Sequence, residues 1–421
     1  MIATALSRLA LVISVIVAGL YWAPIESTGA ASRPTVKTIA TGLTDLPCRS
    51  SVIAAKNNVA VIAYLNDGAI STRRTINGGL SWESVRTISP AGNEDLYNTN
   101  VDCSVQITAT AKYFYVGAYI VTEYDSPGFY QFWRSVDGKK WTRSGRIVDV
   151  SPQLTQVMIA ATKSTLHLAG VSKIIGNPEC LIDESIVCEI SFPLKVIEIP
   201  EATMIARQPI ELDSSTTWDE TEWAGFAIAG GDSVVVTWSN SIEWFSAFRA
   251  SANTWRTPSS FVAFGSSGVP VETFYEARVS IAGKGGLMAY SGTYDGVLRW
   301  RWTTNGGKSW GRERARNDSS WDYAMVRNVW AAGGSYRVAV ERWDDSVSWK
   351  KSDVYRVSSS GAARLWTAPQ NHSVVGGIYA KGRSIVLTRK PYYDPANCTV
   401  SEITGLDCDP VLYAIYGYTS P

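Results

Sequence analysis

The segment Thr75-Ile76-Asn77-Gly78-Gly79-Leu80-Ser81-Trp82 decides the fold, because the chain repeats its pattern twice. The other copies read Ser135-Val136-Asp137-Gly138-Lys139-Lys140-Trp141 and Thr303-Thr304-Asn305-Gly306-Gly307-Lys308-Ser309-Trp310. Asn-Gly and Asp-Gly steps after apolar strands are strong hairpin signals, since these residues accept a positive φ. The hydroxyl and the amide or carboxylate side chains bond backbone groups of the turn, and the tryptophan folds back to cover it. Each copy therefore predicts a hairpin.

These three segments, which we call the box turns, resemble the Asp box or BNR repeat, S/T-x-D/N-x-G-x-x-W. The first and third copies match the pattern fully, and the second lacks one residue between Asp137 and Trp141. The chain therefore resembles the sialidase-like superfamily of Asp-box β-propellers over nearly its whole length after the N-terminal segment. The resemblance implies an all-β fold built from repeated four-stranded blades.

Composition excludes several classes of protein. The 421 residues are 45% hydrophobic and 18% charged, with a formal net charge of +1. This is a globular balance without a disorder signature, and the near-neutral charge argues against nucleic acid or an anionic membrane surface as the main partner. The two histidines and the lack of a C-x-x-C pair predict no metal site. No cofactor motif is present, since the glycine-rich segment 283–286 is followed by no helix that would receive a phosphate.

The N-terminus has the pattern of a secretory signal. Arg8 precedes the apolar run Leu9–Leu20, and small residues follow at 27–31. Cleavage after Ala30 or Ala31 would divide the chain into a signal peptide, residues 1–31, and one propeller domain, residues 32–421. An uncleaved membrane anchor is the alternative, although the run is short for a span. We expect a secreted or extracytoplasmic protein without a later membrane span.

The six cysteines are an even number, as expected for disulfides in an oxidising compartment. Six cysteines allow fifteen pairings. Proximity in the sequence favours the pairs Cys180–Cys188, Cys398–Cys408 and, by elimination, Cys48–Cys103. Asn317, Asn371 and Asn397 begin glycosylation sequons, which matter only if the source organism glycosylates.

A repeat of about 50–60 residues runs through the chain. The box turns begin at residues 75, 135 and 303, so the last interval equals about three periods. Before each box lie two short apolar strands separated by a polar or glycine turn. The predicted units start near Cys48, Asp102, Gln153, Glu222, Glu276, Asp322 and His372. Four strands at this period predict a seven-bladed β-propeller. Six blades is the alternative; two stacked β-sandwiches would not explain the regular spacing.

The seventh unit is one strand short. It offers strands at Val374–Ala380, Ser384–Thr388 and Val411–Tyr418, with a predicted loop at Lys390–Asp409. The segment Thr35–Thr41 reads as a strand that belongs to no unit. Pairing this N-terminal strand with the last blade would close the ring and remove two exposed edges.

The meander of a blade sorts its loops onto two faces. The turns between third and fourth strands, where the box turns lie, are on one face, so we expect the box residues to be structural: Thr75, Asn77, Gly79, Trp82, Ser135, Asp137, Gly138, Trp141, Thr303, Asn305, Gly307 and Trp310. The loops into the innermost strands and between second and third strands are on the opposite face, which we call the start face. Candidates there are Asp45, Arg49, Asp102, Asp219, Glu220, Glu222, Glu276, Arg278, Trp321, Asp322, Tyr323, Asn66, Asp67, Asp125, Tyr294, Asp295, Asp344, Asp345, Tyr392 and Asp394. Any one of them is more often a solvated loop residue than a site residue.

The resemblance implies a chemistry that the sequence matches only by position. Sialidases hold the substrate carboxylate with three arginines and use a Tyr–Glu pair and an Asp. Their first arginine lies in an Arg-Ile-Pro motif, which is absent here; Arg49 occupies a similar place. Arg278 and Arg327 could complete a triad, and Tyr323 or Tyr275 could pair with Glu276. Sialidases have six blades, and seven-bladed Asp-box propellers include xyloglucan-type glycosidases and a photosystem assembly factor.

Two functions remain open from the sequence. One is a secreted binding module that presents its start face to an extracellular glycan or protein, through candidates such as Arg49, Asp102, Arg278, Trp321 and Asp322. The other is an exported glycoside hydrolase with Glu222, Glu276 or Tyr323 as catalytic candidates. Carboxylate separations of roughly 5–5.5 Å or 6.5–9.5 Å would indicate a retaining or an inverting enzyme. Binding is favoured because no catalytic motif is intact.

Overall fold

A computed structural model describes residues 34–420 with gaps at 44–51, 67–68, 89–94, 97–104, 122–128, 148–153, 173, 176–189, 192, 214–225, 240–242, 252–253, 257–258, 263–276, 292–295, 318–322, 345–346 and 402–404. Residues Pro34–Pro421 form one compact unit. The described residues form strands and turns and no helix.

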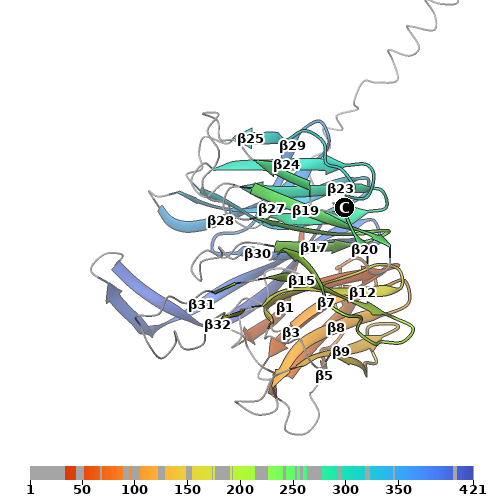
Figure 1. The fold of residues 1–421 in the computed structure, drawn as a ribbon. Helices are drawn as coiled ribbons and strands as arrows, with labels where there is room; N and C mark the ends of the chain where they lie inside the picture. The colour runs from red at the N-terminus through yellow and green to blue at the C-terminus, as the bar shows by residue number, and fades with distance from the viewer. Residues whose placement is uncertain are drawn as a thin grey trace, which may run out of the picture. The chain divides into compact units, whose positions relative to one another are not determined.

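Blades 1 to 3 follow each other along the chain (Figure 1). Blade 1 contains β2 (Ile53–Lys56), β3 (Val59–Asn66), β4 (Ala69–Thr75) and β5 (Arg86–Ile88). Blade 2 contains β7 (Val105–Ala109), β8 (Phe114–Val121), β9 (Phe129–Ser135) and β10 (Thr142–Ile147), with β6 (Asp95–Leu96) also paired to β8. Blade 3 contains β11 (Leu154–Ala161), β12 (Thr165–Ser172), β15 (Leu194–Pro200) and β16 (Ile210–Asp213); β13 (Ile174–Ile175) and β14 (Ile190–Ser191) pair separately.

Blades 4 to 7 complete the set. Blade 4 contains β17 (Phe226–Gly230), β18 (Val234–Ser239) and β19 (Glu243–Ser251), to which both β20 (Thr254–Trp255) and β21 (Ser259–Val262) pair. Blade 5 contains β22 (Arg278–Ala282), β23 (Gly285–Ser291), β24 (Val297–Thr303) and β25 (Arg314–Asn317). Blade 6 contains β26 (Tyr323–Ala332), β27 (Ser335–Asp344), β28 (Val347–Val357) and β29 (Ala362–Thr367). Blade 7 contains β30 (Ser373–Ala380), β31 (Arg383–Ser401), β32 (Gly405–Ser420) and β1 (Thr35–Leu43).

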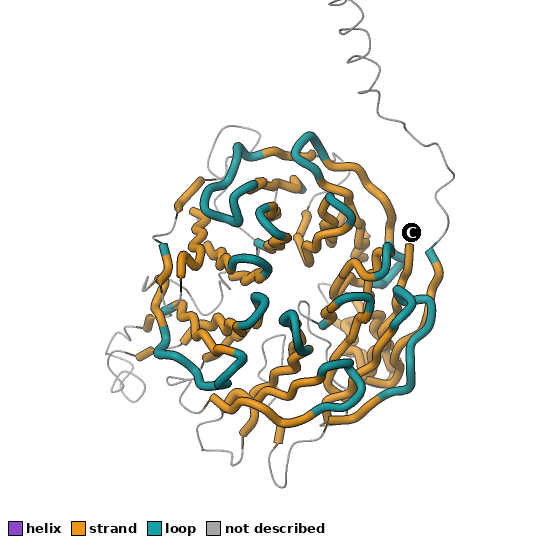
Figure 2. Tube along the Cα trace, turned by 90° about the vertical axis from the view of Figure 1, so that its right-hand side faces the viewer, coloured by secondary structure: helices purple, strands orange, loops and turns teal. Residues whose placement is uncertain are grey.

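The innermost strands of successive blades contact each other in chain order, and β30 of blade 7 contacts β2 of blade 1. The seven blades therefore close a ring, which Figure 2 shows with short turns around a common centre. Each innermost strand begins no more than five residues after its predicted unit start. The predicted seven-bladed β-propeller is confirmed, and the six-bladed alternative is wrong.

The predicted closing strand is also confirmed. β1 pairs antiparallel with β32, with Thr35 opposite Thr419 and Leu43 opposite Tyr413. The predicted loop at Lys390–Asp409 is wrong, because β31 and β32 continue through this region as a long two-stranded ribbon (Figure 1). The sequence did not predict these strands because the ribbon lies outside the repeat that indicated the other strands. The ribbon register places Cys398 opposite Cys408, and the disulfide between them stays a prediction. The other four cysteines lie outside the described residues.

The cores lie between neighbouring blades because each blade packs on two others. The middle strand β3 is buried on both faces, and its Val61 belongs to a cluster that includes Val116 of blade 2. Trp300 and Trp302 of β24 pack towards blade 6, where the Trp302 ring meets Tyr336 edge-on at 5.0 Å. Each large side chain buried in this way contributes about 1.5–3 kcal/mol.

Candidate functional site

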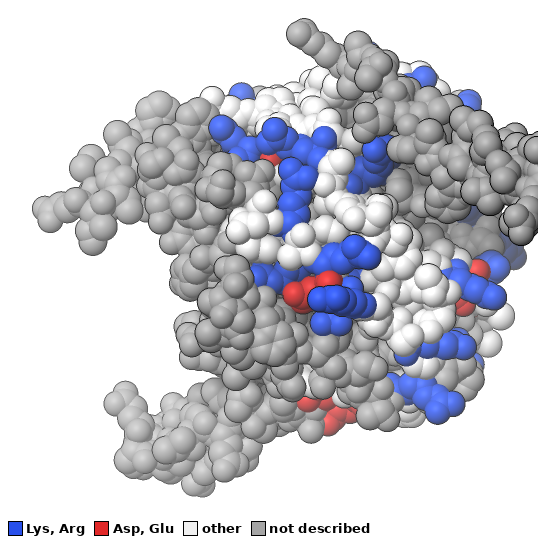
Figure 3. Space-filling view, turned by 90° about the horizontal axis from the view of Figure 1, so that it is seen from above, with Lys and Arg blue, Asp and Glu red and all other residues white. Residues whose placement is uncertain are grey.

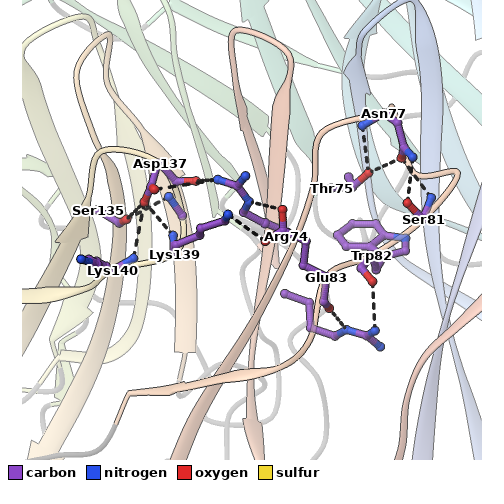
Figure 4. Close-up of polar contacts among 12 residues, drawn as sticks. Arg74, Thr75, Asn77, Ser81, Trp82, Glu83, Ser135, Asp137, Lys139 and Lys140 are labelled. Atoms are coloured by element: carbon purple, nitrogen blue, oxygen red, sulfur yellow. Dashed lines mark hydrogen bonds and ion pairs between the residues drawn. The ribbon is translucent and has the colours of Figure 1, made fainter.

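The box turns are held by their own side chains. In the first, Thr75 Oγ1 accepts a hydrogen bond from the Gly79 N–H at 2.9 Å. Asn77 Oδ1 accepts one from the Ser81 N–H at 3.0 Å (Figure 4). The turn at 303–310 repeats both contacts at 3.0 Å. Hydroxyl and amide oxygens thus satisfy backbone donors that the tight turn leaves without ladder partners.

The shorter second turn uses a carboxylate in place of the amide. Ser135 Oγ accepts from the Gly138 N–H at 2.9 Å, and Asp137 Oδ1 accepts from the Lys139 N–H at 2.9 Å. Partial burial alone would raise the pKa of Asp137, but the backbone N–H bonds outweigh it and lower that pKa. Arg74 of blade 1 donates to the Asp137 carbonyl oxygen at 2.6 Å (Figure 4), so the turn is tied to the preceding blade.

The box glycines lie so close to the preceding blade that a side chain would collide with it. A Cβ on Gly138 would lie 2.5 Å from Val61 of blade 1, and one on Gly307 would lie 2.2 Å from Val235 of blade 4. Gly79 abuts blade 7 in the same way. All three have a positive φ, which glycine adopts without steric cost. A glycine is required at these positions both by the turn and by the blade contact.

The box tryptophans pack between blades rather than into a ligand site. Trp310 Nε1 donates to Ser246 Oγ of blade 4 at 2.9 Å, and its ring packs on the core between blades 4 and 5. Trp141 packs on the core between blades 1 and 2, and Trp82 on the core between blades 7 and 1. These are packing contacts, and the structural role of the box residues stays a prediction.

Most start-face candidates lie outside the described residues. These are Asp45, Arg49, Asp67, Asp102, Asp125, Asp219, Glu220, Glu222, Tyr275, Glu276, Tyr294, Asp295, Trp321, Asp322 and Asp345. Tyr323 begins β26, and Asp344, Tyr392 and Asp394 lie on strands, with only their backbones described. The start-face candidates with fully described positions are Asn66, which ends β3 and is half-buried, and Arg278, which begins β22.

Arg278 lies on the wall of a central cavity of about 290 Å³. The innermost strands of all seven blades supply its lining, which is mostly isoleucine, alanine and glycine, with Thr108 and Asn328 as polar members. Among the described lining residues Arg278 is the charged one, and its exposed fraction is 5%. The structure therefore places an arginine on a cavity wall whose other described residues are uncharged.

A β-bulge in the neighbouring blade receives Arg278. Val326 pairs with Val340 and Asn328 with Ala339, so the strand register shifts by one residue at Arg327. Arg278 Nε donates to the Arg327 carbonyl oxygen at 3.2 Å. Bulges of this kind re-aim side chains and are common next to functional sites.

The bulged Arg327 connects the cavity wall to a buried carboxylate. Arg327 Nε donates to Glu341 Oε2 at 2.6 Å, with both side chains almost fully buried, and Ser373 Oγ donates to Glu341 Oε1 at 3.4 Å. A buried ion pair keeps its charges because each compensates the other. Arg278 and Arg327, which the resemblance suggested as two arms of a triad, do lie together, but Arg327 is paired to Glu341.

Part of the role of Arg278 is structural. Gln106 of blade 2, which is fully buried, donates through Nε2 to the Val157 carbonyl oxygen in blade 3, and its Oε1 accepts from the Ile159 N–H at 2.9 Å. This bridge between innermost strands matches the bridge from Arg278 to blade 6. The guanidinium differs from the amide by its charge, which gives the site its chemistry.

His372 extends this polar region into blade 7. Its Nδ1 lies 2.9 Å from Thr388 Oγ1, and its ring packs against Tyr416 at 4.9 Å between centroids. Burial, assisted by the positive charge of Lys390, lowers the pKa of His372 to about 4. The imidazole is neutral at pH 7 and acts here as a hydrogen-bonded packing residue.

Sequence reasoning missed the buried acids. Glu198 accepts two bonds from Arg249 of the next blade, at 2.6 and 2.9 Å, and Glu313 pairs with the Tyr290 hydroxyl. Asp353 forms an ion pair with Arg342, with Oδ2 2.8 Å from Nε. The available signal was an acid within an apolar strand, as at Ile197-Glu198-Ile199. The described residues hold no cluster of three metal-ligating side chains and no helix long and apolar enough to span a membrane.

No family model matches the chain, and no curated protein matches it. Solved structures with a similar fold include polysaccharide lyase Uly1, at a TM-score of 0.48 and 9% identity over 95% of this chain and 94% of that chain. Phage phi92 endosialidase matches at 0.47 and 8% over 92% and 69%. The WD40 domain of Toxoplasma gondii coronin matches at 0.44 and 7% over 93% and 87%. Several of the similar propellers act on carbohydrates by their names, and at these identities the likeness concerns the fold alone.

Proposed function

We propose that the protein is an exported, sialidase-like Asp-box propeller that binds an acidic extracellular glycan at its centre. The observation that carries the proposal is the buried Arg278 on a cavity lined by all seven innermost strands. A cavity of about 290 Å³ suits one sugar-sized group, since ligand pockets start at roughly 300 Å³. A carboxylate gains most from a cation held away from water.

Binding of acidic oligosaccharides to the purified protein tests this proposal. We expect Arg278→Gln to weaken the affinity for carboxylated oligosaccharides at least about tenfold, because a charge-assisted contact contributes about 1.5–3 kcal/mol. Affinity for neutral oligosaccharides should change little. Arg314→Gln, at an exposed position on β25, is the matched control. Because Arg278 also bridges two blades, the melting temperature of each variant must be measured in parallel.

Unchanged binding of acidic glycans by a folded Arg278→Gln variant would refute the proposal. Glycoside hydrolysis remains the alternative function from the sequence, and the same preparations should be assayed on sialosides and neutral polysaccharides. Without an Arg-Ile-Pro motif we expect negligible release of sialic acid. Turnover of sialosides lost in Arg49→Ala, or of a neutral glycan lost in Glu222→Gln or Glu276→Gln, would establish the hydrolase instead.

A further inference from the structure

The turns between first and second strands place a ring of lysines on the face that carries the box turns, which we call the box face. In an antiparallel meander the first and third turns of a blade lie at the same end. Five of the seven first turns contain or adjoin a lysine: Lys56, Lys112, Lys163, Lys284 and Lys381. The residues just before several of these turns, including Ala55, Ala109 and Ala161, line the central cavity.

Contacts between neighbouring blades link the first turns of blades 1 to 4. Lys56 Nζ of blade 1 donates to the Lys112 carbonyl oxygen of blade 2 at 2.5 Å. The Ala111 N–H donates to the Lys163 carbonyl oxygen of blade 3 at 3.1 Å. Lys163 Nζ lies 2.9 Å from Asp232 Oδ1 in the first turn of blade 4. Figure 2 shows the turns gathered around the centre.

The box turns add three further lysines at 139, 140 and 308. The carboxylates described on this face already have partners. Glu83 pairs with Arg74 and Lys139, and Asp137 accepts backbone N–H groups of its own turn. Glu201 accepts from Thr110 and from the Tyr115 hydroxyl, and Asp232 pairs with Lys163. The box face thus has a clear excess of positive charge, although the net charge of the whole chain is only +1.

Large aliphatic side chains are exposed among these lysines. Ile76, Leu80 and Val136 lie in the box turns with exposed fractions of 49%, 36% and 61%. Val36, which is 49% exposed, lies at the start of β1 on the same face. Tyr379, next to the last residue of β30, is also exposed. Most of the exposed large apolar residues in the described chain therefore gather near one face.

We propose that the box face docks on an anionic lipid bilayer. Lysine ammonium groups suit diffuse attraction to a charged surface, whereas planar recognition of individual carboxylates or sulfates favours arginine. Basic residues near an anionic bilayer are attracted by its surface potential, and aliphatic side chains among them reach the interfacial region. A polysaccharide would favour several exposed aromatic rings for stacking, whereas the exposed large apolar residues described on this face are aliphatic apart from Tyr379. The chain also enters the propeller on this face, because Thr35 pairs with Thr419 beside the box turns.

Docking in this way leaves the start face directed away from the bilayer. The proposed glycan site is centred on the ring axis, and neither proposal depends on the other. The outer strands β25 and β29 of blades 5 and 6, at the top of Figure 1, provide a comparison surface because that side also carries many Lys and Arg side chains (Figure 3). Arg314 of β25 and Arg364 of β29 are exposed there, and so is Lys351 of β28, the strand next to β29.

Sedimentation with vesicles containing 30% phosphatidylglycerol tests the proposal on the full chain. We expect the triple change Lys112→Gln, Lys284→Gln and Lys381→Gln to lower partitioning roughly 100-fold at low salt, since each lysine near an anionic surface contributes about a fivefold effect. The charge-matched triple change Arg314→Gln, Lys351→Gln and Arg364→Gln should have little effect. High salt should abolish the difference between the two variants.

The aliphatic part of the surface is tested separately. Val136→Ser with Ile76→Ser should lower vesicle binding several-fold at high salt, where charge is screened, because less apolar surface is buried. Leu365→Ser, at a residue 46% exposed on β29, is the control and should bind like the parent. Circular dichroism confirms that each variant is folded.

Three results would overturn the proposal. The first is equal loss of vesicle binding in the two charge-matched triple variants. The second is parental binding by the Lys112, Lys284 and Lys381 variant at low salt. The third is binding to soluble dextran sulfate without any preference for anionic over neutral phosphatidylcholine vesicles, which would assign the face to a polyanion in solution. Any residual binding through the N-terminal apolar segment is common to all variants and cancels in these comparisons.

Discussion

Gly307 and Gly334 have nearly the same backbone conformation, with φ of +86° and +80°, but different surroundings. A side chain at Gly307 would collide with Val235 of the preceding blade, while Gly334 has no atom within 4 Å of an added Cβ. The pair therefore separates the two reasons for a glycine: backbone conformation and contact between blades. In the box turns both reasons apply, which explains why this residue anchors each copy of the pattern.

Alanine at these two positions should have clearly different effects. Gly334→Ala should lower the free energy of unfolding by about 1–2 kcal/mol through its left-handed conformation. Gly307→Ala should cost about 1–3 kcal/mol more, because the methyl group overpacks the contact with blade 4. Equilibrium denaturation in urea measures both. Equal losses would show that blade 4 moves away freely and that the box glycine serves only the turn.

At the scale of elements, β1 decides whether the last blade has an exposed edge. Ile39 and Leu43 of β1 are almost fully buried in the core between blades 7 and 1, while Lys37 and Thr38 face solvent. The strand was recognisable from Thr35–Thr41 because the seventh unit was one strand short. The long ribbon of β31 and β32 was not recognisable, because it extends beyond the repeat that defined every other strand.

Aspartate on the two sides of β1 tests this closure. Ile39→Asp places a charge in an apolar core and should destabilise the protein by at least about 3 kcal/mol. Thr38→Asp, on the exposed side, should change stability by less than about 0.5 kcal/mol. Thermal unfolding and light scattering measure both variants, and we expect aggregation of Ile39→Asp from the freed edge of β32. A cooperative transition at the parental temperature in that variant would contradict the closing role.

For the whole molecule, the buried polar residues couple stability to pH. Burial lowers the pKa of His167 to about 4, with Arg249 and Arg207 acting in the same direction and Glu198 opposing them. Neither ring nitrogen of His167 has a hydrogen-bond partner among the described residues. His372 has a pKa of about 4 as well. Both histidines are therefore neutral in the folded protein where an unfolded chain would begin to protonate them, near pH 6.5.

Stability should consequently fall as the pH drops from about 6.5 towards 4. In this range the unfolded chain binds more protons than the folded one, and each histidine contributes a slope of at most about 1.4 kcal/mol per pH unit. Urea denaturation at pH 7, 6 and 5 measures the effect. His167→Leu should remove about half of the slope between pH 6.5 and 5. A free energy of unfolding that stays constant or rises over this range would show that both histidines are protonated in the folded state.

The sequence by itself determined the box turns, the repeat, the number of blades and the closing strand, because each depends on residues within a few positions of one another or on a regular interval. Turn chemistry and alternating apolar residues are local properties of a chain. The start-face candidates rested on the same logic, but local signals could not distinguish site residues from solvated ones.

Only the tertiary structure decided the chemistry at the centre. Arg278 meets Arg327 because β22 and β26 lie side by side and because a bulge turns the Arg327 carbonyl oxygen towards it. Glu341 becomes a buried partner of Arg327 through strand pairing within blade 6. The lysines of the first turns are about 50 or more residues apart in the chain, and closure of the ring makes them neighbours. These lysines are scattered along the sequence. They form one positively charged surface because the fold places the first turn of each blade around a single axis.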